Sequence, residues 1–239
     1  MAGTDSKITT VGYYCNPIQY AEHRKTLENV ICTAGKFGAT HVSTFAGAWE
    51  GKPVESAYEE FGKVFRELAD LAEEKGVKLG IENCLMDGTW EHATCNIGFN
   101  PKAWEVMFEE VKNDNFGLEW EPTHQMVQLI DPVTELRKWC KKIVHIHGKD
   151  ATIDWDAVRH SGISGAVPFV WHRMPGFGDT NWRDIISILR SNGYEDDICI
   201  EGYHDPVYSG ELEMTGQLHA LNYLKWCRGG DFTPTPWAK

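Results

Sequence analysis

Two kinds of hydrophobic pattern alternate along the chain. Short runs rich in β-branched and aromatic residues, which favour strands, occur at residues 8–14, 41–46, 77–84, 116–121, 143–147 and 197–203. Longer segments have apolar residues three and four positions apart, which form one face of a helix, at residues 22–37, 54–75, 101–111, 131–142, 181–191 and 211–226. The pattern therefore predicts six strands, each followed by a helix.

Alternating strands and helices predict a parallel sheet, because each parallel pairing requires a crossover connection. An open doubly wound sheet and a closed barrel both fit this order. Charged residues end the last four predicted strands, as in a barrel whose strand ends converge. Residues 175–178 (Pro-Gly-Phe-Gly) lie in a loop and lack the third glycine of a dinucleotide-binding fingerprint. We therefore predict an α/β fold with a TIM-type (β/α) barrel.

Two segments lack a clear hydrophobic period. Residues 152–180 contain many glycines and two prolines, and a loop of this length is usually functional, such as an active-site lid. Residues 228–239 are rich in proline and are expected to form a loose tail. Barrels of this class reach 239 residues as one unit, so we expect a single domain over residues 1–239.

Charge and cysteine content narrow the class of protein. The net charge of −12 argues against nucleic acid, whose phosphate backbone needs basic grooves, and against anionic membrane surfaces. The seven cysteines are scattered without a CxxC pair, so we expect reduced thiols. The chain shows no basic-then-apolar leader and no run of about 18 apolar residues. We therefore expect a soluble, cytoplasmic protein that does not bind membranes.

Three glutamates and a histidine lie at or next to the carboxyl ends of four predicted strands: Glu82, Glu121, His147 and Glu201. In a closed barrel these strand ends surround one point. Alone, a glutamate at a strand end is usually a solvated charge, and a lone histidine is usually a satisfied core residue. Together, three carboxylates and one imidazole form a hard donor set that suits Mn²⁺ or Mg²⁺, with Co²⁺ and Zn²⁺ as substitutes.

Five short motifs, taken together and in this order, resemble one known family. They are Gly-Ile-Glu-Asn-Cys at residues 80–84, Gly-Leu-Glu-Trp-Glu-Pro-Thr-His at 117–124, His-Ile-His-Gly-Lys-Asp at 145–150, Pro-Gly-Phe-Gly at 175–178 with Trp182, and Ile-Cys-Ile-Glu at 198–201. From about residue 8 to residue 224, the chain resembles the xylose isomerase-like TIM barrels, which include sugar phosphate isomerases and epimerases. Each motif alone is weak, but the set is specific.

The resemblance implies a divalent-metal-dependent sugar isomerase or epimerase. It implies that Glu82, Glu121, His147 and Glu201 hold the metal ion, for which we expect Mn²⁺. It also implies that Glu82 and Glu201 are the acid–base pair that moves a proton next to a carbonyl, through an enediolate. Lewis-acid polarisation of that carbonyl is the expected role of the ion.

The resemblance further implies that His124, Lys149 and Arg173 bind the substrate, a small sugar or polyol. The same proton abstraction would serve an alternative enzyme, a lyase or dehydratase that acts on a keto-sugar or keto-inositol. DNA repair enzymes of the endonuclease IV type share the barrel, but they use a trinuclear zinc site with more histidines. A noncatalytic barrel subunit is the alternative outside enzymes.

Two features depart from the pattern of the family. An aspartate normally occupies the position of Glu121, whose extra methylene moves the carboxylate by about 1.5 Å. Glu119 lies on the same face of the strand and is an alternative ligand. The family also has two more β/α units before residues 8–14, so we expect an N-terminally shortened barrel with about six of eight units. Because this leaves two open edges, we expect a homo-oligomer or a partner chain to cover them.

Overall fold

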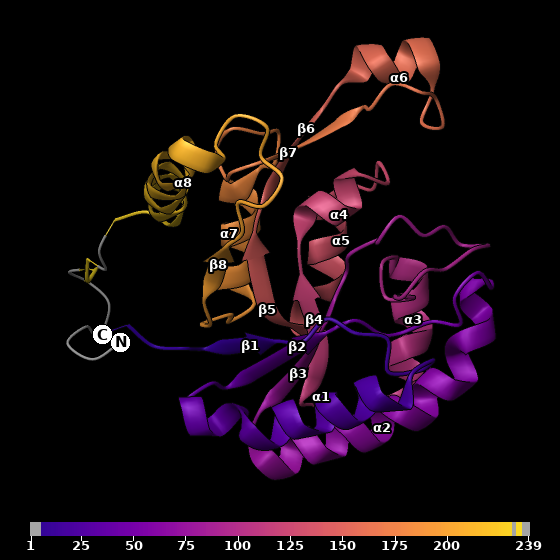
Figure 1. Ribbon diagram of the computed structural model, residues 1–239. Helices are drawn as coiled ribbons and strands as arrows, with labels where there is room; N and C mark the ends of the chain where they lie inside the picture. The colour runs from indigo at the N-terminus through magenta and orange to yellow at the C-terminus, as the bar shows by residue number, and fades with distance from the viewer. Residues whose placement is uncertain (1–5, 231–232, 236–239) are drawn as a thin grey trace.

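The computed structural model of the protein describes residues 6–230 and 233–235. Within these residues, six parallel strands form a sheet that curls into a half-barrel, in the spatial order β1-β2-β3-β4-β5-β8 (Figure 1). The strands are β1 (Thr10–Gly12), β2 (His41–Thr44), β3 (Lys78–Glu82), β4 (Phe116–Trp120), β5 (Ile143–Gly148) and β8 (Ile198–Ile200). The predicted α/β class and the partial barrel of parallel strands are confirmed.

Helices connect these strands and pack outside the sheet (Figure 1). They are α1 (Ala21–Ala34), α2 (Tyr58–Lys75), α3 (Pro101–Glu110), α5 (Pro132–Trp139), α7 (Trp182–Ser191) and α8 (Glu213–Arg228). Gly76 ends α2 in the left-handed conformation, with φ of 69°, which glycine adopts without steric cost. Pro101 begins α3, where its missing N–H is not needed. These boundaries agree with the sequence-based prediction.

Aromatic side chains fill the core between the sheet and α2. The rings of Phe61 and Phe65, one helical turn apart on α2, stack with their centroids 4.6 Å apart. The Phe65 ring also lies 6.0 Å from the ring of Phe116 on β4. All three side chains are buried, so the apolar stripe of the helix is joined directly to a central strand.

Residues 150–173 differ from the long loop that the sequence predicts. β6 (Asp150–Ile153) and β7 (Val170–Arg173) form an antiparallel ribbon, and α6 (Trp155–Ser161) lies at its far end, away from the sheet (Figure 1). Each strand has four residues, which is too few to show a period. The segment after β4 also differs, because α4 (Pro122–Met126) begins at the proline that ends the strand.

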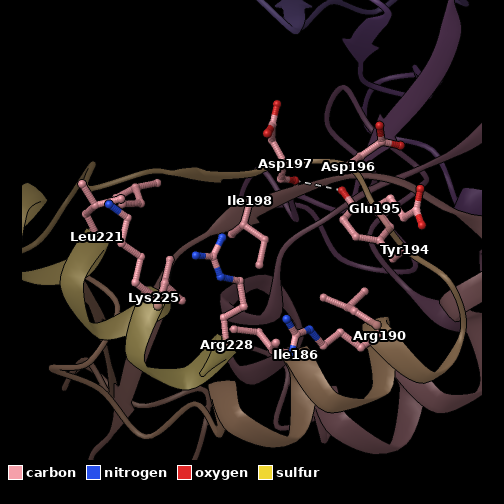
Figure 2. Close-up of a pocket in the computed structure, with 13 residues that line it drawn as sticks. Ile186, Arg190, Tyr194, Glu195, Asp196, Asp197, Ile198, Leu221, Lys225 and Arg228 are labelled. Carbon is pink, nitrogen blue, oxygen red and sulfur yellow. Dashed lines mark hydrogen bonds between the residues drawn. The ribbon is translucent and has the colours of Figure 1, made fainter. Parts of the chain in front are cut away.

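Strands β1 and β8 are the two edges of the sheet within the described residues. A groove of about 430 Å³ lies beside β8, between α7 and α8, and Ile186, Ile198 and Leu221 are among the residues that line it (Figure 2). Arg190 and Lys225 add charged groups to this lining. A second copy or partner chain over the open edge stays a prediction.

The remaining expectations about the chain concern its termini and membranes. The expected loose tail at residues 228–239 overlaps the end of α8 at Arg228, and residues 231–232 and 236–239 lie outside the described part of the chain. Within the described ranges, no helix has the length and apolar character needed to cross a membrane.

The aromatic cluster on α2 gives a test of the core. We expect Phe65→Ala to lower the free energy of unfolding by about 3–5 kcal/mol, because it leaves a cavity next to Phe61 and Phe116. Phe37 is 64% exposed, so Phe37→Ala is a matched control with an expected change within about 0.5 kcal/mol. Urea unfolding of both variants measures the difference, and equal losses would contradict this description of the core.

Candidate metal centre

The carboxyl ends of four strands bring the predicted ligands to one place. Glu82 is the last residue of β3, and Glu121 follows β4 as the N-cap residue of α4. His147 lies in β5, and Glu201 follows β8. Each of the four residues offers one ligand atom, and these atoms lie within 4.8 Å of one another. The structure therefore assembles the set that the sequence predicts.

One nitrogen of the His147 ring lies at the centre of this cluster. Its Nδ1 atom is 3.0 Å from Glu82 Oε1 and 3.2 Å from Glu201 Oε2. The same nitrogen is 3.7 Å from Glu121 Oε2. Three carboxylates from three different strand ends thus face a single imidazole nitrogen.

Several carboxylate oxygens in the cluster are buried without a hydrogen-bond partner. Both oxygens of Glu121 and the Oε2 atom of Glu201 have none among the described residues. A buried carboxylate oxygen that has lost water and gained no partner is energetically costly. A cation in contact with these oxygens would remove this cost, so the donor atoms fit a divalent metal ion.

The balance of charge favours a divalent cation. Lys149 Nζ lies 2.9 Å from Glu201 Oε1 and 3.8 Å from Glu121 Oε1. With all four nearby carboxyl groups ionised, as they would be around a bound metal ion, their charge exceeds that of protonated His147 and Lys149 by two. The four carboxylates belong to Glu82, Glu119, Glu121 and Glu201. Oxygen donors with one imidazole suit Mn²⁺, Mg²⁺, Co²⁺ or Zn²⁺.

Burial and ion pairing shift the pKa values in opposite directions. Burial raises the pKa of Glu121 to about 8, although the nearby Lys149 ammonium lowers it in part. Burial also raises the pKa of Glu201, but His147 and Lys149 outweigh it and hold that pKa below its usual range. Burial alone would lower the pKa of His147, yet the carboxylates that surround its ring raise it strongly. Metal binding therefore has to displace a proton from His147.

Buried asparagines fix the backbone at two of the strand ends. The side chain of Asn83 accepts a hydrogen bond from Glu121 N at 2.7 Å and donates one to Glu121 O at 2.9 Å. Asn96 donates to the carbonyl oxygens of Glu82 and Cys84 at 2.9 and 2.8 Å. Both amides hold ligand-bearing backbone in position, a role that the sequence analysis missed. The signal that could have identified these two asparagines is a polar amide at the end of a buried segment.

The structure separates the three predicted substrate-binding residues. His124 Nε2 lies 3.4 Å from Glu121 Oε1, and Lys149 contacts Glu201 and Glu121, so both lie at the cluster. Arg173 instead pairs with Asp205, with Nε 3.3 Å from Oδ2, and none of the contacts described for it reaches the metal ligands. A substrate role for Arg173 stays an untested prediction.

His172, the neighbour of Arg173, is a further residue that the sequence analysis missed. Its ring centroid lies 6.2 Å from that of His124. His172 belongs to β7, and successive side chains in a strand point to opposite faces. Because this strand was predicted to be a loop, no sequence pattern placed His172 beside His124.

The chain is similar in sequence to a known family and to curated proteins. Residues 3–225 match the family model described as "Xylose isomerase-like TIM barrel". The inosose dehydratase of Clostridium tetani is 26% identical over 182 residues, which cover 74% of this chain and 57% of that relative. The inosose dehydratase of Clostridium perfringens is 22% identical over 227 residues, covering 91% of this chain and 73% of that relative. The match thus spans little more than half of the first relative.

Solved structures show the same fold. A xylose isomerase domain protein from Planctomyces limnophilus has a TM-score of 0.71 at 18% identity, covering 93% of this chain and 76% of that chain. The IOLI protein with a binding zinc atom has a TM-score of 0.65 at 21% identity, covering 92% and 74%. D-psicose 3-epimerase, solved in the presence of D-fructose, has a TM-score of 0.68 at 16% identity, covering 93% and 79%.

The cluster predicts one divalent ion per chain. We expect chelator-treated protein dialysed against Mn²⁺ or Zn²⁺ to hold about one ion by elemental mass spectrometry. The double variant Glu82→Gln/Glu201→Gln should lose more than tenfold in affinity, because two anionic donors become neutral amides. Glu59 and Glu109 are exposed, so Glu59→Gln/Glu109→Gln is the matched control. Equal metal content in both double variants would contradict the assignment.

The raised pKa of Glu121 predicts a pH dependence of stability in the metal-free protein. The folded-state pKa of about 8 exceeds the ordinary value of 4.5. The protonated group therefore contributes stability below pH 4.5, and this contribution is lost as the pH rises through 8. Relative to Glu121→Gln, the wild type should lose up to about 1.4 kcal/mol of unfolding free energy per pH unit in this window. Urea unfolding at a series of pH values measures the unfolding free energy of both proteins. Equal slopes of this free energy against pH would contradict the prediction.

Proposed function

Because the chain belongs to the xylose isomerase-like TIM barrel family, we propose that it is a metal-dependent lyase that dehydrates a keto-inositol or a keto-sugar. The observation that carries this proposal is the convergence of Glu82, Glu121, His147 and Glu201, with buried oxygens that lack hydrogen bonds. Such a site suits removal of a proton from the carbon next to a carbonyl.

The relatives favour elimination over the isomerisation that the motifs first suggested. The two curated relatives described above are both inosose dehydratases. D-psicose 3-epimerase is 16% identical to this chain, and at this identity the similarity shows the fold alone. A dehydratase was the alternative in the sequence analysis, and it now becomes the main proposal.

A divalent cation held by Glu82, Glu121, His147 and Glu201 would act as a Lewis acid on the substrate carbonyl. Glu201 is the better candidate for the base. Its side chain is 29% exposed, against 9% for Glu82, so substrate can reach it more readily. Its lowered pKa keeps it as a carboxylate. One of its oxygens therefore takes the proton from the carbon next to the carbonyl.

Lys149 supplies the acid that elimination requires. Burial would lower the pKa of Lys149, but the carboxylates of Glu121 and Glu201 outweigh it and raise that pKa, so the group stays an ammonium. Its Nζ proton goes to the departing hydroxyl, which leaves as water. Glu201 Oε1 lies 2.9 Å from Lys149 Nζ, so the abstracted proton can pass back to the amine and restore both groups.

Epimerisation of a sugar is the second candidate, because the cluster holds two carboxylates that could exchange protons with substrate. Glu82 and Glu201 each lie within 3.2 Å of His147 Nδ1. One would remove the proton and the other would return it to the opposite face. The products separate the two reactions, since elimination gives an unsaturated ketone and epimerisation gives only a stereoisomer.

The test uses metal-loaded protein with a keto-inositol and a panel of keto-sugars in deuterated water. We expect loss of one water by mass spectrometry. Glu201→Gln should lower kcat by about 10²–10⁴-fold, because it removes the base. Lys149→Met should still exchange the hydrogen next to the carbonyl but form much less unsaturated product, because it removes only the acid.

Lys141 is exposed, so Lys141→Met is the matched control and should behave as the wild type. Metal content is measured for every variant, which separates a lost ion from a lost proton transfer. A stereoisomer without loss of water would replace the lyase by the epimerase. Full activity in Glu201→Gln would reject both reactions, and an inactive protein that binds no metal would support a noncatalytic barrel.

A further inference from the structure

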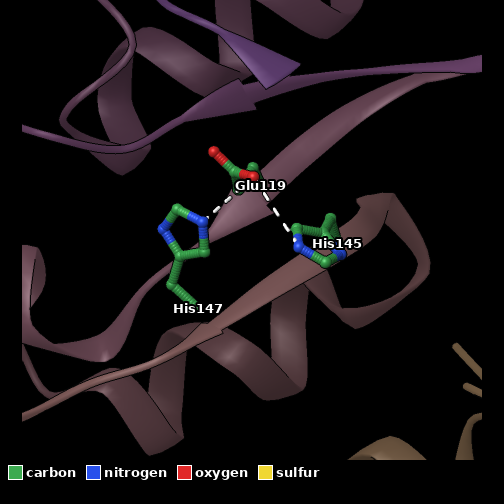
Figure 3. Close-up of side chains that lie close together, drawn as sticks. All are labelled: Glu119, His145 and His147. Carbon is green, nitrogen blue, oxygen red and sulfur yellow. Dashed lines mark ion pairs between the residues drawn. The ribbon is translucent and has the colours of Figure 1, made fainter. Parts of the chain in front are cut away.

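A fourth carboxylate lies on the opposite side of the His147 ring from the metal cluster. Glu119 Oε1 is 3.2 Å from His147 Nε2 and 3.8 Å from His145 Nε2 (Figure 3). Glu119 belongs to β4 and pairs in register with His145 of the neighbouring strand β5. Glu121, and not Glu119, joins Glu82 and Glu201 at Nδ1. The two glutamates thus face the same ring from its two nitrogens.

We infer that Glu119 is a positioning residue that holds the His147 ring with its Nε2 protonated and its Nδ1 directed at the metal ligands. An imidazole that binds a metal through one nitrogen commonly donates its other N–H to a carboxylate, which fixes the tautomer and the ring orientation. Here Nδ1 faces three carboxylates and Nε2 faces Glu119. This inference rests on the proposed metal site.

The burial of Glu119 supports this role. The residue has no exposed surface, and a buried carboxylate without compensation is costly. Its Oε2 atom accepts a hydrogen bond from the Tyr14 hydroxyl at 2.8 Å. Its Oε1 atom has no hydrogen-bond partner of good geometry among the described residues, and the nearer of the two imidazoles that face it is that of His147. Tyr14 therefore fixes one oxygen of Glu119, and the other oxygen is available to His147.

His145 faces the same oxygen of Glu119 as His147, but from a longer distance, 3.8 Å against 3.2 Å. Its Nδ1 lies 3.3 Å from the hydroxyl oxygen of Thr10 on β1, while its Nε2 faces Glu119. The rings of His145 and His147 meet edge to face, with centroids 5.7 Å apart. Glu119 is thus held between Tyr14, which follows β1, and the two histidines of β5, which limits how far its carboxylate can move.

A second metal ion is the main rival interpretation of these residues. Glu119, His145 and His147 also offer atoms within 4.8 Å of one another. An ion there would require His147 to bind metal through both ring nitrogens, and the ring would have to lose its second proton. A carboxylate that accepts the Nε2 proton requires no such loss. We therefore expect one ion per chain, with Glu119 as an acceptor and not a ligand.

The experiment measures Zn²⁺ and Co²⁺ dissociation constants by competition with a chromophoric chelator for wild type, Glu119→Gln and Glu119→Leu. We expect Glu119→Leu to weaken binding by about 10–100-fold, because the ring loses its acceptor. Glu119→Gln keeps an acceptor oxygen in the same shape and should lose clearly less. Tighter metal binding by Glu119→Gln than by Glu119→Leu distinguishes a positioning role from a general loss of folding. Circular dichroism checks the folding of each variant separately.

A spectroscopic readout tests the tautomer directly. Long-range ¹⁵N–¹H correlation spectra of Zn²⁺-loaded protein should show His147 protonated at Nε2 in the wild type. In Glu119→Leu, the protonated nitrogen should become a mixture or the metal-bound form should be lost. Glu59 is exposed, so Glu59→Leu is the matched control, and the Nε2 proton of His147 should persist in it.

The outcomes separate this inference from the proposed metal site. A wild type that binds no divalent ion would reject the metal site itself. A wild type that binds one ion, with an unchanged dissociation constant in Glu119→Leu, would reject only the role of Glu119. Two ions per wild-type chain, or a wild-type His147 protonated at Nδ1, would also overturn the inference.

Discussion

Removal of carboxylates from water at the carboxyl ends of the strands is the constraint on which the rest of this structure depends. Glu82, Glu119 and Glu121 are buried, and each would be costly without a positive group or a hydrogen bond beside it. His147 and Lys149 supply part of the compensation. The remaining excess of negative charge is what makes a divalent cation a suitable occupant of the cluster.

The fold meets this constraint by placing the carboxylates at the two nitrogens of the His147 ring. Glu82, Glu121 and Glu201 face one nitrogen of His147, and Glu119 faces the other. The first three are the proposed metal ligands, and the fourth is the proposed acceptor for the ring proton. Glu121 reaches the cluster although the family pattern has an aspartate there. Its backbone is fixed on both sides by Asn83, so the longer side chain starts from a defined position.

Strand β8 links this chemistry to the open side of the half-barrel. Ile198 lines the groove between α7 and α8, whereas Glu201, three residues later, joins the metal ligands. The base that we propose therefore stands next to an edge strand that has one neighbour within the described residues. Changes that stiffen or displace this edge would alter the position of Glu201 with respect to Lys149.

The sequence by itself determined the parts of the structure that depend on local chemistry. The period of apolar residues gave the six parallel strands and the helices between them, and Gly76 and Pro101 marked helix boundaries through their own backbone geometry. The four expected ligands meet because the ends of parallel strands lie at one edge of the sheet, which strand order alone implies. His124 and Lys149 were placed at the site by the family motifs.

Tertiary structure alone decided which side chains face each other. The β6–β7 ribbon consists of two four-residue strands, too short to show a period, and the place of His172 beside His124 depends on that ribbon. Arg173 lies next to His172 in the sequence but pairs with Asp205, because neighbouring strand residues point to opposite faces. Glu121 was the expected ligand, and Glu119 was the alternative on the same face of the strand. Only the three-dimensional position of the His147 ring between them gave the two carboxylates different partners.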